Sequence, residues 1–413
     1  MSEKSPLKII LSLVVLLGAI AYSVSLSLRP SDFDVYLRAS EWMLSGKSPY
    51  NEWFFVKEGH YCLYFYSPFW AMFLAPLSYL PDFLPKFVWL LANIFFLFRI
   101  WKLLSGYVDL SGLSSRKKQL LLLFSVLLSI RFILYNFEML QMTIFLLWGC
   151  LESMRLIRRD QFILGGLLLA AIINIKLMPL VLLPYLLYRA HYKAFASTLV
   201  WSIVFLLVPA LLLGWSDNLV LLQDWWSSVN PTNMEHAVEV DPGLHSLTAL
   251  VPLFFLDSSA GLDATPENLT TSTETINLIT NMVRLGLIAS TLFILKWPPF
   301  KRSHSKLQLL KEIAFILLLI PLIFPHQQKY AFLLTLPAQF FLLYELLMTE
   351  RFELRSRLSL ILLVFSFILM TCTTDGLIGS ELYAWTQHYK LVTFGSLFLI
   401  VGMFFAGSQS TNQ

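Results

Sequence analysis

Two carboxylates stand one residue apart just after the first apolar run of the chain. Apolar residues recur at helical spacing over residues 31–44, so Asp32 and Asp34 fall in the first turn of a predicted amphipathic helix at a membrane surface. Ser31 as N-cap with Asp34 three residues later is a capping-box pattern, which explains Asp34 without catalysis. Asp32 has no capping role in this register, and we predict that it acts as a general base. An Asp-x-Asp pair also occurs in metal sites, but two carboxylates do not complete a magnesium site.

Several basic residues lie within or next to apolar segments, where a charged side chain is unfavourable. Lys176 joins two short apolar segments, and a lysine at membrane depth costs about 3 kcal/mol or more, so we expect it to face a cavity or an anion. The alternative is a side chain that extends to the outer surface. His326 and Lys329 flank two glutamines and are candidates for holding an anion; hydrogen bonding to helix ends is the alternative. Arg131 is a further anion candidate, as is Arg284, for which an ion pair with an acidic loop is equally consistent.

The composition determines which elements must position these residues. Of 413 residues, 57% are hydrophobic and 14% charged, and the mean hydropathy is +0.68; soluble domains have about 25% charged residues. The chain is therefore predicted to be an all-α, polytopic integral membrane protein forming a single domain over residues 1–413. A net charge of +4 is too small to indicate nucleic acid. Three widely spaced cysteines and scattered histidines predict neither a disulfide framework nor a metal site.

Apolar runs predict about twelve transmembrane helices. Those around Lys176 are too short to stand alone in lipid, and such helices are stable only inside a bundle. The predicted spans are 8–28, 83–104, 119–135, 140–157, 162–175, 177–190, 195–214, 275–297, 307–325, 330–348, 357–374 and 389–407.

The positive-inside rule orients these spans with both termini in the cytoplasm. Two long segments, 29–82 and 215–274, then lie on the outer face, and the second contains no Lys or Arg. Polar groups for chemistry therefore have room only on the outer face. Twenty of the 30 Lys and Arg residues fall on the inner side: Lys4, Lys8, Arg99, Lys102, Arg116, Lys117, Lys118, Arg155, Arg158, Arg159, Arg189, Lys193, Lys296, Lys301, Arg302, Lys306, Lys311, Arg351, Arg355 and Arg357.

An ordered series of short motifs resembles a known family. The series is similar to polyprenol-phosphate-dependent glycosyltransferases of the GT-C fold, and more closely to glycosyltransferase family 87, the alpha-mannosyltransferase-like group. Two places depart from the family pattern: Pro325-His326-Gln327 replaces a Trp-x-His-type motif, and Leu244-His245 replaces Asn-Gln. The motifs are Asp32-Phe33-x-Val35-Tyr36, Gly46-x-x-Pro49-Tyr50, Tyr64-x-Tyr66-Ser67-Pro68-Phe69, Ala75-Pro76-Leu77, Gln141, Gly165-Gly166-Leu167, Ile175-Lys176-x-x-Pro179, Ser246-Leu247 and Pro325.

The resemblance implies an enzyme that moves a hexose, by resemblance mannose, from a polyprenyl-phosphate donor to a lipid-linked glycan or glycolipid. It places the catalytic base at Asp32. Such a reaction needs cations or hydrogen-bond donors for the leaving phosphate. We expect no soluble cofactor and no metal requirement, membrane lipids as surroundings, and a plasma (inner) membrane location with the active site outside. The candidate substrate-binding residues are Asp34, Tyr36, Arg131, Gln141, Lys176, His245, His326 and Lys329.

Two other classes of protein share some of these features. Gln141 and Asn136 suit sugar hydroxyls, but polar residues also join helices to one another. A transporter or lipid flippase predicts two similar halves with a charged site at mid-membrane, and no such repeat is found. A non-catalytic assembly protein with the same fold is the third interpretation, against which the intact Asp32 motif argues modestly.

Overall fold

The structure is a computed structural model that describes residues 6–230, 233, 236–257, 261–262, 264–295, 299–302, 305–350 and 353–406, with residues 6–16 and 60 described by their backbone alone. Lys4, Lys296 and Arg351 of the charge argument lie outside these residues, and so does the side chain of Lys8.

The described part of the chain is helical almost throughout. One antiparallel hairpin, β1 (Phe54–Lys57) and β2 (His60–Cys62), pairs Phe54 with Cys62. The α-helices are α1 (Pro6–Ser27), α2 (Asp32–Leu44), α3 (Pro68–Leu74), α4 (Phe83–Ser105), α5 (Ser115–Met139), α6 (Thr143–Arg158), α7 (Phe162–Ile175), α8 (Leu182–Tyr188), α9 (Tyr192–Leu207), α10 (Ala210–Leu213), α11 (Trp215–Val229), α12 (Leu247–Leu250), α13 (Thr273–Leu295), α14 (Lys306–Ile323), α15 (Leu336–Met348), α16 (Leu354–Met370), α17 (Asp375–Ile378), α18 (Ser380–His388) and α19 (Leu391–Phe405). Short 3₁₀ turns are η1 (Ala75–Leu77), η2 (Met178–Val181), η4 (Val251–Phe255), η5 (Pro266–Asn268) and η6 (Lys329–Thr335).

The predicted apolar segments are helical, but the count of twelve spans is not confirmed. The prediction for α7 agrees at both ends, whereas 177–190 is divided into η2 and α8. Among the described residues, five helices are long and apolar enough to cross a membrane, and a sixth span results if α18 and α19, which meet at a 58° bend, are taken together. The five are Phe83–Ser105, Ser115–Met139, Tyr192–Leu213, Thr273–Leu295 and Lys329–Met348.

Helix α14 forms the centre of the bundle. Every residue from Leu309 to Leu322 is buried, and α14 packs against α13, α15, α19 and η6. A helix that is apolar on all sides is stable only when protein or lipid surrounds it completely. Here the neighbouring helices surround it, so α14 is an interior helix of the protein.

Close helix contacts depend on small residues. A Cβ on Gly166 of α7 would lie 2.5 Å from the Ser197 Oγ of α9, so only glycine allows this approach. Small residues at helix interfaces let backbones come together in membranes, where apolar burial provides little driving force between helices. The Gly165-Gly166 motif therefore sets the position of α7, whose end leads to Lys176.

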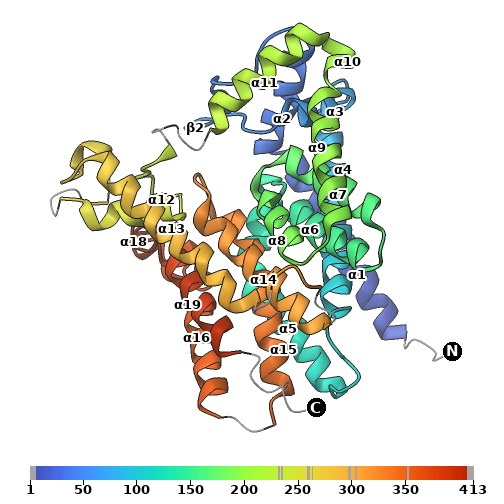
Figure 1. Cartoon of the computed structure of the whole chain (residues 1–413), viewed down its shortest axis with the longest axis vertical. Helices are drawn as coiled ribbons and strands as arrows, with labels where there is room; N and C mark the ends of the chain where they lie inside the picture. Colours follow the sequence, from blue (N-terminus) through green and yellow to red (C-terminus); the bar gives the residue numbers. More distant parts are fainter. Residues whose placement is uncertain are drawn as a thin grey trace.

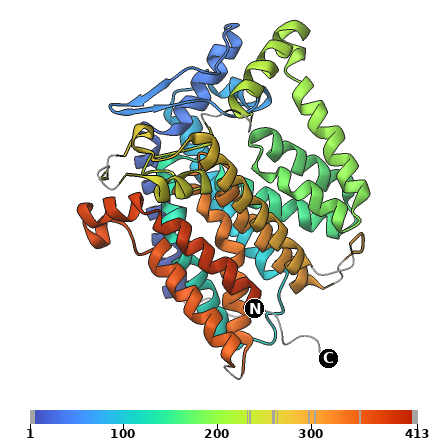
Figure 2. The same ribbon diagram turned by 60° about the vertical axis from the view of Figure 1, so that its left-hand side comes forward.

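The first long segment predicted outside and helix α11 of the second gather at one end of the molecule. In Figures 1 and 2, α2, α3, the hairpin and α11 lie together at the top. Trp225 of α11 donates its indole N–H to the Phe65 carbonyl at 3.1 Å, and Ser228 Oγ donates to Asn51 Oδ1 at 3.0 Å. These bonds fasten α11 to the first long segment. Trp226 is 55% exposed, in keeping with a helix at an interface.

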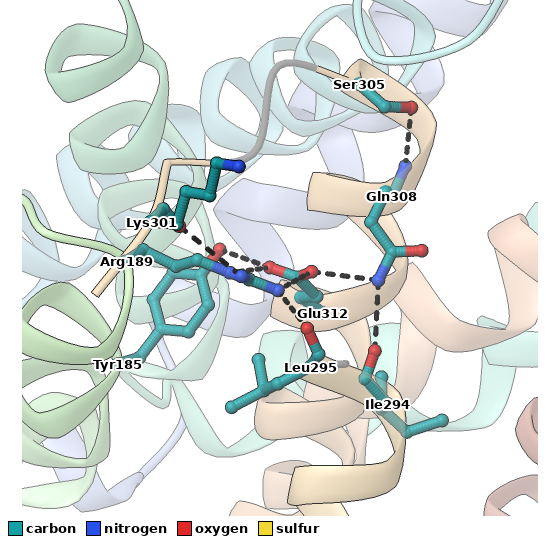
Figure 3. Close-up of polar contacts among 8 residues, drawn as sticks. All are labelled: Tyr185, Arg189, Ile294, Leu295, Lys301, Ser305, Gln308 and Glu312. Carbon is teal, nitrogen blue, oxygen red and sulfur yellow. Dashed lines mark hydrogen bonds and ion pairs between the residues drawn. The ribbon is translucent and has the colours of Figure 1, made fainter. Parts of the chain in front are cut away.

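A buried ion pair joins α8 to the start of α14, at the end that the charge pattern places inside (Figure 3). Glu312 is fully buried, and Arg189 contacts both of its oxygens, with Nε at 2.9 Å. Tyr185 donates its hydroxyl and Gln308 its amide to the same carboxylate, at 3.0 and 2.8 Å. Arg189 also donates to the Leu295 carbonyl, so one guanidinium links α8, α13 and α14.

Candidate active site

Asp32 occupies the first residue of α2 and is 7% exposed. The helix begins there because Ser31 has an extended backbone at the N-cap, and Phe33, Val35 and Tyr36 anchor the first turn in the core. Met43 completes the buried face, and Leu44, the last residue of the helix, is 38% exposed. The carboxylate is therefore held inside the protein at a helix N-terminus, where negative charge is favoured.

Asp34 is taken up by structural contacts. It completes the capping box predicted for Ser31, whose backbone N–H donates to Asp34 Oδ2 at 2.7 Å. Its Oδ1 lies 2.9 Å from the ammonium of Lys86, a buried residue of α4. Lys86 also donates to the Arg29 carbonyl at 3.0 Å. Asp34 thus fixes α2 against α4.

Gln141 approaches Asp32 from the turn between α5 and α6. Leu140 ends α5 in the left-handed conformation (φ 51°), which redirects the chain and brings Gln141 inward. The side-chain Nε2 donates to Asp32 Oδ2 at 2.5 Å, and Oε1 accepts from the Tyr36 hydroxyl at 3.4 Å. The Tyr36 hydroxyl also bonds to that of Tyr66 at 2.8 Å. Gln141, predicted as a sugar contact, here binds the candidate base.

Cys62 of the hairpin lies against the other oxygen of the base. Its thiol donates to Asp32 Oδ1 at 3.7 Å. Burial, followed by the negative charge of Asp32, raises the pKa of the Cys62 thiol to about 12. The thiol is therefore neutral at physiological pH. Sequence reasoning missed this residue, because a single cysteine without a partner motif gives no signal.

Lys176 faces two aromatic rings beside this network. Its backbone ends α7 in an extended conformation (φ −144°), and Ser67 Oγ donates to the carbonyl of Asn174 just before it. The ammonium lies 5.8 Å from the ring centroid of Tyr66 and 5.2 Å from that of Tyr330. Among the described residues it makes neither a hydrogen bond nor an ion pair. The two aromatic faces attract the ammonium, and the Asp32 carboxylate also interacts with its charge.

Two further predicted cations continue from Tyr330. Tyr135 stacks on Tyr330 with centroids 6.2 Å apart, and Lys329 lies 5.1 Å from the Tyr135 centroid and bonds to the Tyr383 hydroxyl. Arg131 donates to the Met370 carbonyl at 2.7 Å and to Thr373 Oγ1 at 2.8 Å. In the described part of the chain, neither Lys329 nor Arg131 has a carboxylate within ion-pair distance. We call Lys176, Tyr330, Tyr135, Lys329, Tyr383 and Arg131 the cation row.

His326 points away from the cation row. Its backbone is left-handed (φ 56°), and its ring stacks on Phe65 with centroids 5.5 Å apart. Nδ1 lies 2.7 Å from Glu239 Oε1, and Nε2 lies 2.5 Å from Nδ1 of His236, whose Nε2 lies 2.9 Å from the Ser228 carbonyl. Both ends of this chain accept only, so His326 Nδ1 donates to Glu239 and His236 Nε2 donates to the Ser228 carbonyl.

His245 is fully buried, and its backbone N–H donates to the Gln327 carbonyl at 2.8 Å. Its Nε2 lies 3.1 Å from Gln387 Oε1, and Thr393 donates to its carbonyl at 2.6 Å. Burial, together with the positive charges of Lys390 and Lys329, lowers the pKa of His245 well below its usual range. The ring is therefore neutral at physiological pH and does not supply a positive charge to a phosphate.

The structure thus brings together part of the predicted set. Three of the predicted residues surround the Asp32 carboxylate: Tyr36, Gln141 and Lys176. Lys329 and Arg131 lie further along the cation row. Asp34, His245 and His326 point elsewhere. Among the described residues, no three His, Cys, Asp or Glu side chains form a group that would hold a metal ion.

The arrangement joins a buried carboxylate to cations that have no carboxylate partner among the described residues, which suits acid–base chemistry on an anionic substrate. Comparison with known families decides its class. Residues 64–325 match glycosyltransferase family 87. The chain belongs to this family. It is a glycosyltransferase and a multi-pass integral membrane protein. No curated protein and no solved structure matches the chain.

The residues that match the family model include most of the candidate site but not Asp32. Gln141, Lys176, Arg131 and His245 lie inside the matched residues of this glycosyltransferase, whereas Asp32, thirty-two residues before the match begins, lies outside them. The structure connects Asp32 to the matched region through the Gln141 amide. A transferase that attacks with an acceptor hydroxyl needs a base within hydrogen-bond reach.

Proposed function

We propose that this glycosyltransferase transfers a hexose, mannose by resemblance, from a polyprenyl-phosphate donor to a lipid-linked glycan or glycolipid. Asp32 acts as the general base. The observation that carries the proposal is the buried Asp32 carboxylate, hydrogen-bonded by Gln141 and flanked by the unpaired Lys176 ammonium.

The reaction is a single displacement. The acceptor oxygen attacks the anomeric carbon and gives its proton to the Asp32 carboxylate, while the bond from that carbon to the phosphate oxygen breaks. The bonding electrons leave with the polyprenyl phosphate, and one displacement inverts the anomeric configuration. A hydroxyl is a weak nucleophile, so base assistance is worth about 10²–10⁴ in rate.

Lys176 and the rest of the cation row hold the departing phosphate. In the described part of the chain, Lys176, Lys329 and Arg131 have no carboxylate partner, and such cations are costly in an apolar bundle unless an anion binds there. Negative charge that grows on the phosphate as the bond breaks is stabilised by cations already in place. The lipid phosphate thus takes the role of a nucleotide, and the reaction requires no soluble cofactor.

The charge pattern supports an orientation for this chemistry. With both termini in the cytoplasm of a plasma (inner) membrane, α2, the hairpin and α11 lie outside. The donor and the acceptor then meet at the outer leaflet, with their lipid chains in the bilayer.

In vitro transfer tests the proposal. Purified protein in lipid nanodiscs is given a synthetic polyprenyl-phosphate mannose with radiolabelled sugar and glycolipid extracted from its source membrane. Wild type transfers the label to lipid, and the transfer rate of Asp32→Asn is lower by about 10²–10⁴-fold. Glu41→Gln, an exposed acid on the same helix, is the matched control and retains it. A wild type that moves no sugar from polyprenyl-phosphate donors, yet exchanges substrate across liposomes, is a transporter.

A further inference from the structure

The amide of Gln141 lies between two groups that fix its orientation. An ionised carboxylate only accepts hydrogen bonds, so the NH₂ group of Gln141 must face Asp32 Oδ2. The amide oxygen then faces Tyr36, and that oxygen only accepts. The Tyr36 hydroxyl must therefore donate to Gln141.

The direction continues to Tyr66. Because Tyr36 spends its single proton on Gln141, it must accept from the Tyr66 hydroxyl across their 2.8 Å contact. Every donor in the chain from Tyr66 through Tyr36 and Gln141 points toward Asp32. Hydrogen bonds that point in one direction polarise and strengthen one another in a low-dielectric interior.

We infer that Gln141 is a positioning residue that holds the Asp32 carboxylate in place, with Tyr36 and Tyr66 fixing the orientation of its amide. The inference rests on the proposed function for its catalytic meaning, but the geometry it describes does not require turnover. Gln141 is 3% exposed, so water does not replace its hydrogen bonds readily. It acts through Asp32 and is not itself expected to contact the sugar.

Other titratable groups lie around Asp32 and must be held constant in a test. The titratable side chains whose charges interact with Asp32, among those that the structure describes, are Tyr36, Cys62, Tyr66, Tyr135, Lys176 and Tyr330. Lys176 is the cation among these six, and the other five side chains are uncharged when they are protonated. A variant at Gln141 leaves all six in place.

Two substitutions of nearly the same size separate positioning from packing. Gln141→Met keeps the length and apolar bulk of the side chain and removes both hydrogen bonds. Gln141→Glu keeps the acceptor toward Tyr36 and replaces the donor toward Asp32 by a second carboxylate. Gln339→Met is the matched control: Gln339 is 1% exposed and accepts from Ser129 Oγ at 2.6 Å. Ser129 lies ten residues before the end of α5, about 15 Å along the helix.

The first measurement is the pH dependence of kcat/KM. A hydrogen bond to the charged form favours that form, so its loss moves the acid limb of the profile to higher pH. The limb moves upward in Gln141→Met and further in Gln141→Glu, where two carboxylates share a proton. The turnover of Gln141→Met falls about 100-fold, because a small misplacement of a base has that effect. Gln339→Met keeps the wild-type profile. A Gln141→Met enzyme with the wild-type acid limb and kcat overturns the inference.

The second measurement needs no sugar transfer. In a Cys150→Ser, Cys372→Ser background, Cys62 is the remaining cysteine, and its alkylation by iodoacetamide reports its contact with Asp32. Asp32→Asn removes the carboxylate and speeds alkylation at pH 8 by about tenfold, since one pKa unit changes the thiolate fraction tenfold. Gln141→Met releases the carboxylate from its position and approaches the same rate, whereas Gln339→Met stays at the parental rate.

The two measurements separate the two claims. Parental alkylation in Gln141→Met, with faster alkylation in Asp32→Asn, shows that Asp32 stays in place without Gln141 and overturns the inference. Parental alkylation in both variants does so as well, because the Asp32 geometry is then absent. If wild type transfers no sugar, the proposed function fails, and the alkylation rates still decide the role of Gln141.

Discussion

His326 donates both its backbone N–H and its ring Nδ1–H to one oxygen of Glu239, each at 2.7 Å. The other oxygen accepts from Ser246 Oγ at 3.0 Å and Thr248 Oγ1 at 2.6 Å. Four donors thus converge on a carboxylate that is 5% exposed. This contact holds the 325–329 loop, which carries Lys329 on its other side, against the second long segment.

We therefore expect the folding stability to fall at acidic pH as the Glu239 carboxylate becomes protonated. Burial alone would raise the pKa of this carboxyl, but the His326 ring, Thr248 and the His326 backbone hold the pKa below its usual range. A depressed pKa stabilises the fold at pH above the ordinary value, about 4.3, and that stability is lost as the pH falls through the folded value. We expect Glu239→Gln to lower stability by about 2 kcal/mol at pH 7. The measurement is the thermal midpoint in detergent at one scan rate, whose difference from wild type should shrink from pH 6 to pH 3. A difference that stays constant over this range would contradict the assignment.

Lys176→Met should separate donor binding from stability. The ammonium has no described carboxylate or hydrogen-bond partner, so its removal leaves no buried group unpaired and the thermal midpoint should stay level or rise. Loss of a cation at the leaving phosphate should lower kcat by about 10²–10³. Transfer kinetics with the polyprenyl-phosphate donor measure this, and Lys57→Met, at an exposed residue of the hairpin, is the control. A Lys176→Met enzyme with normal kcat would place the phosphate elsewhere.

Asp34→Asn should act on stability. Removing one partner of a buried ion pair costs about 3–5 kcal/mol, because Lys86 keeps its charge inside the protein. The double variant Asp34→Asn, Lys86→Met should recover part of this loss, since no uncompensated charge remains. Thermal midpoints of the two single variants and the double variant form a complete cycle. Additive losses would show that the two side chains do not interact.

The ion pair of Glu312 and Arg189 makes the corresponding prediction at the opposite end of the bundle. Glu312→Gln leaves a buried guanidinium without its carboxylate and should cost about 3–5 kcal/mol. Since the pair contacts none of the residues around Asp32, the acid limb of the transfer profile should not move. A shift in that limb would show that the two ends are coupled.

The sequence predicted helices well because their signals are local. The ends of α7 follow from its apolar run, the lysine after it and Pro179, and the capping box follows from the Ser31–Asp34 spacing. Breaks at η2 and η6 were not predicted, since hydropathy does not distinguish a 3₁₀ turn from an α-helix. The number of spans was not confirmed, because several apolar helices are too short to cross alone.

The site was predicted only in part, because its contacts join distant residues. Nothing in the sequence pairs Gln141 with Asp32, 109 residues apart, or Lys86 with Asp34. Tyr135, Tyr330 and Tyr383 are three among sixteen tyrosines, so their alignment with Lys329 leaves no pattern. The direction of His326 depends on a left-handed backbone that non-glycine residues seldom adopt.

Helix α14 is enclosed by other helices, which separate it from the bilayer. Apolar side chains of α4, α9 and α13 are exposed at the surface, whereas residues 309–322 of α14 are buried among other side chains. A change in lipid thickness or saturation therefore acts first on the peripheral helices. Lys329 begins η6, and η6 packs on α14, so the catalytic geometry is anchored to a helix whose residues 309–322 are all buried.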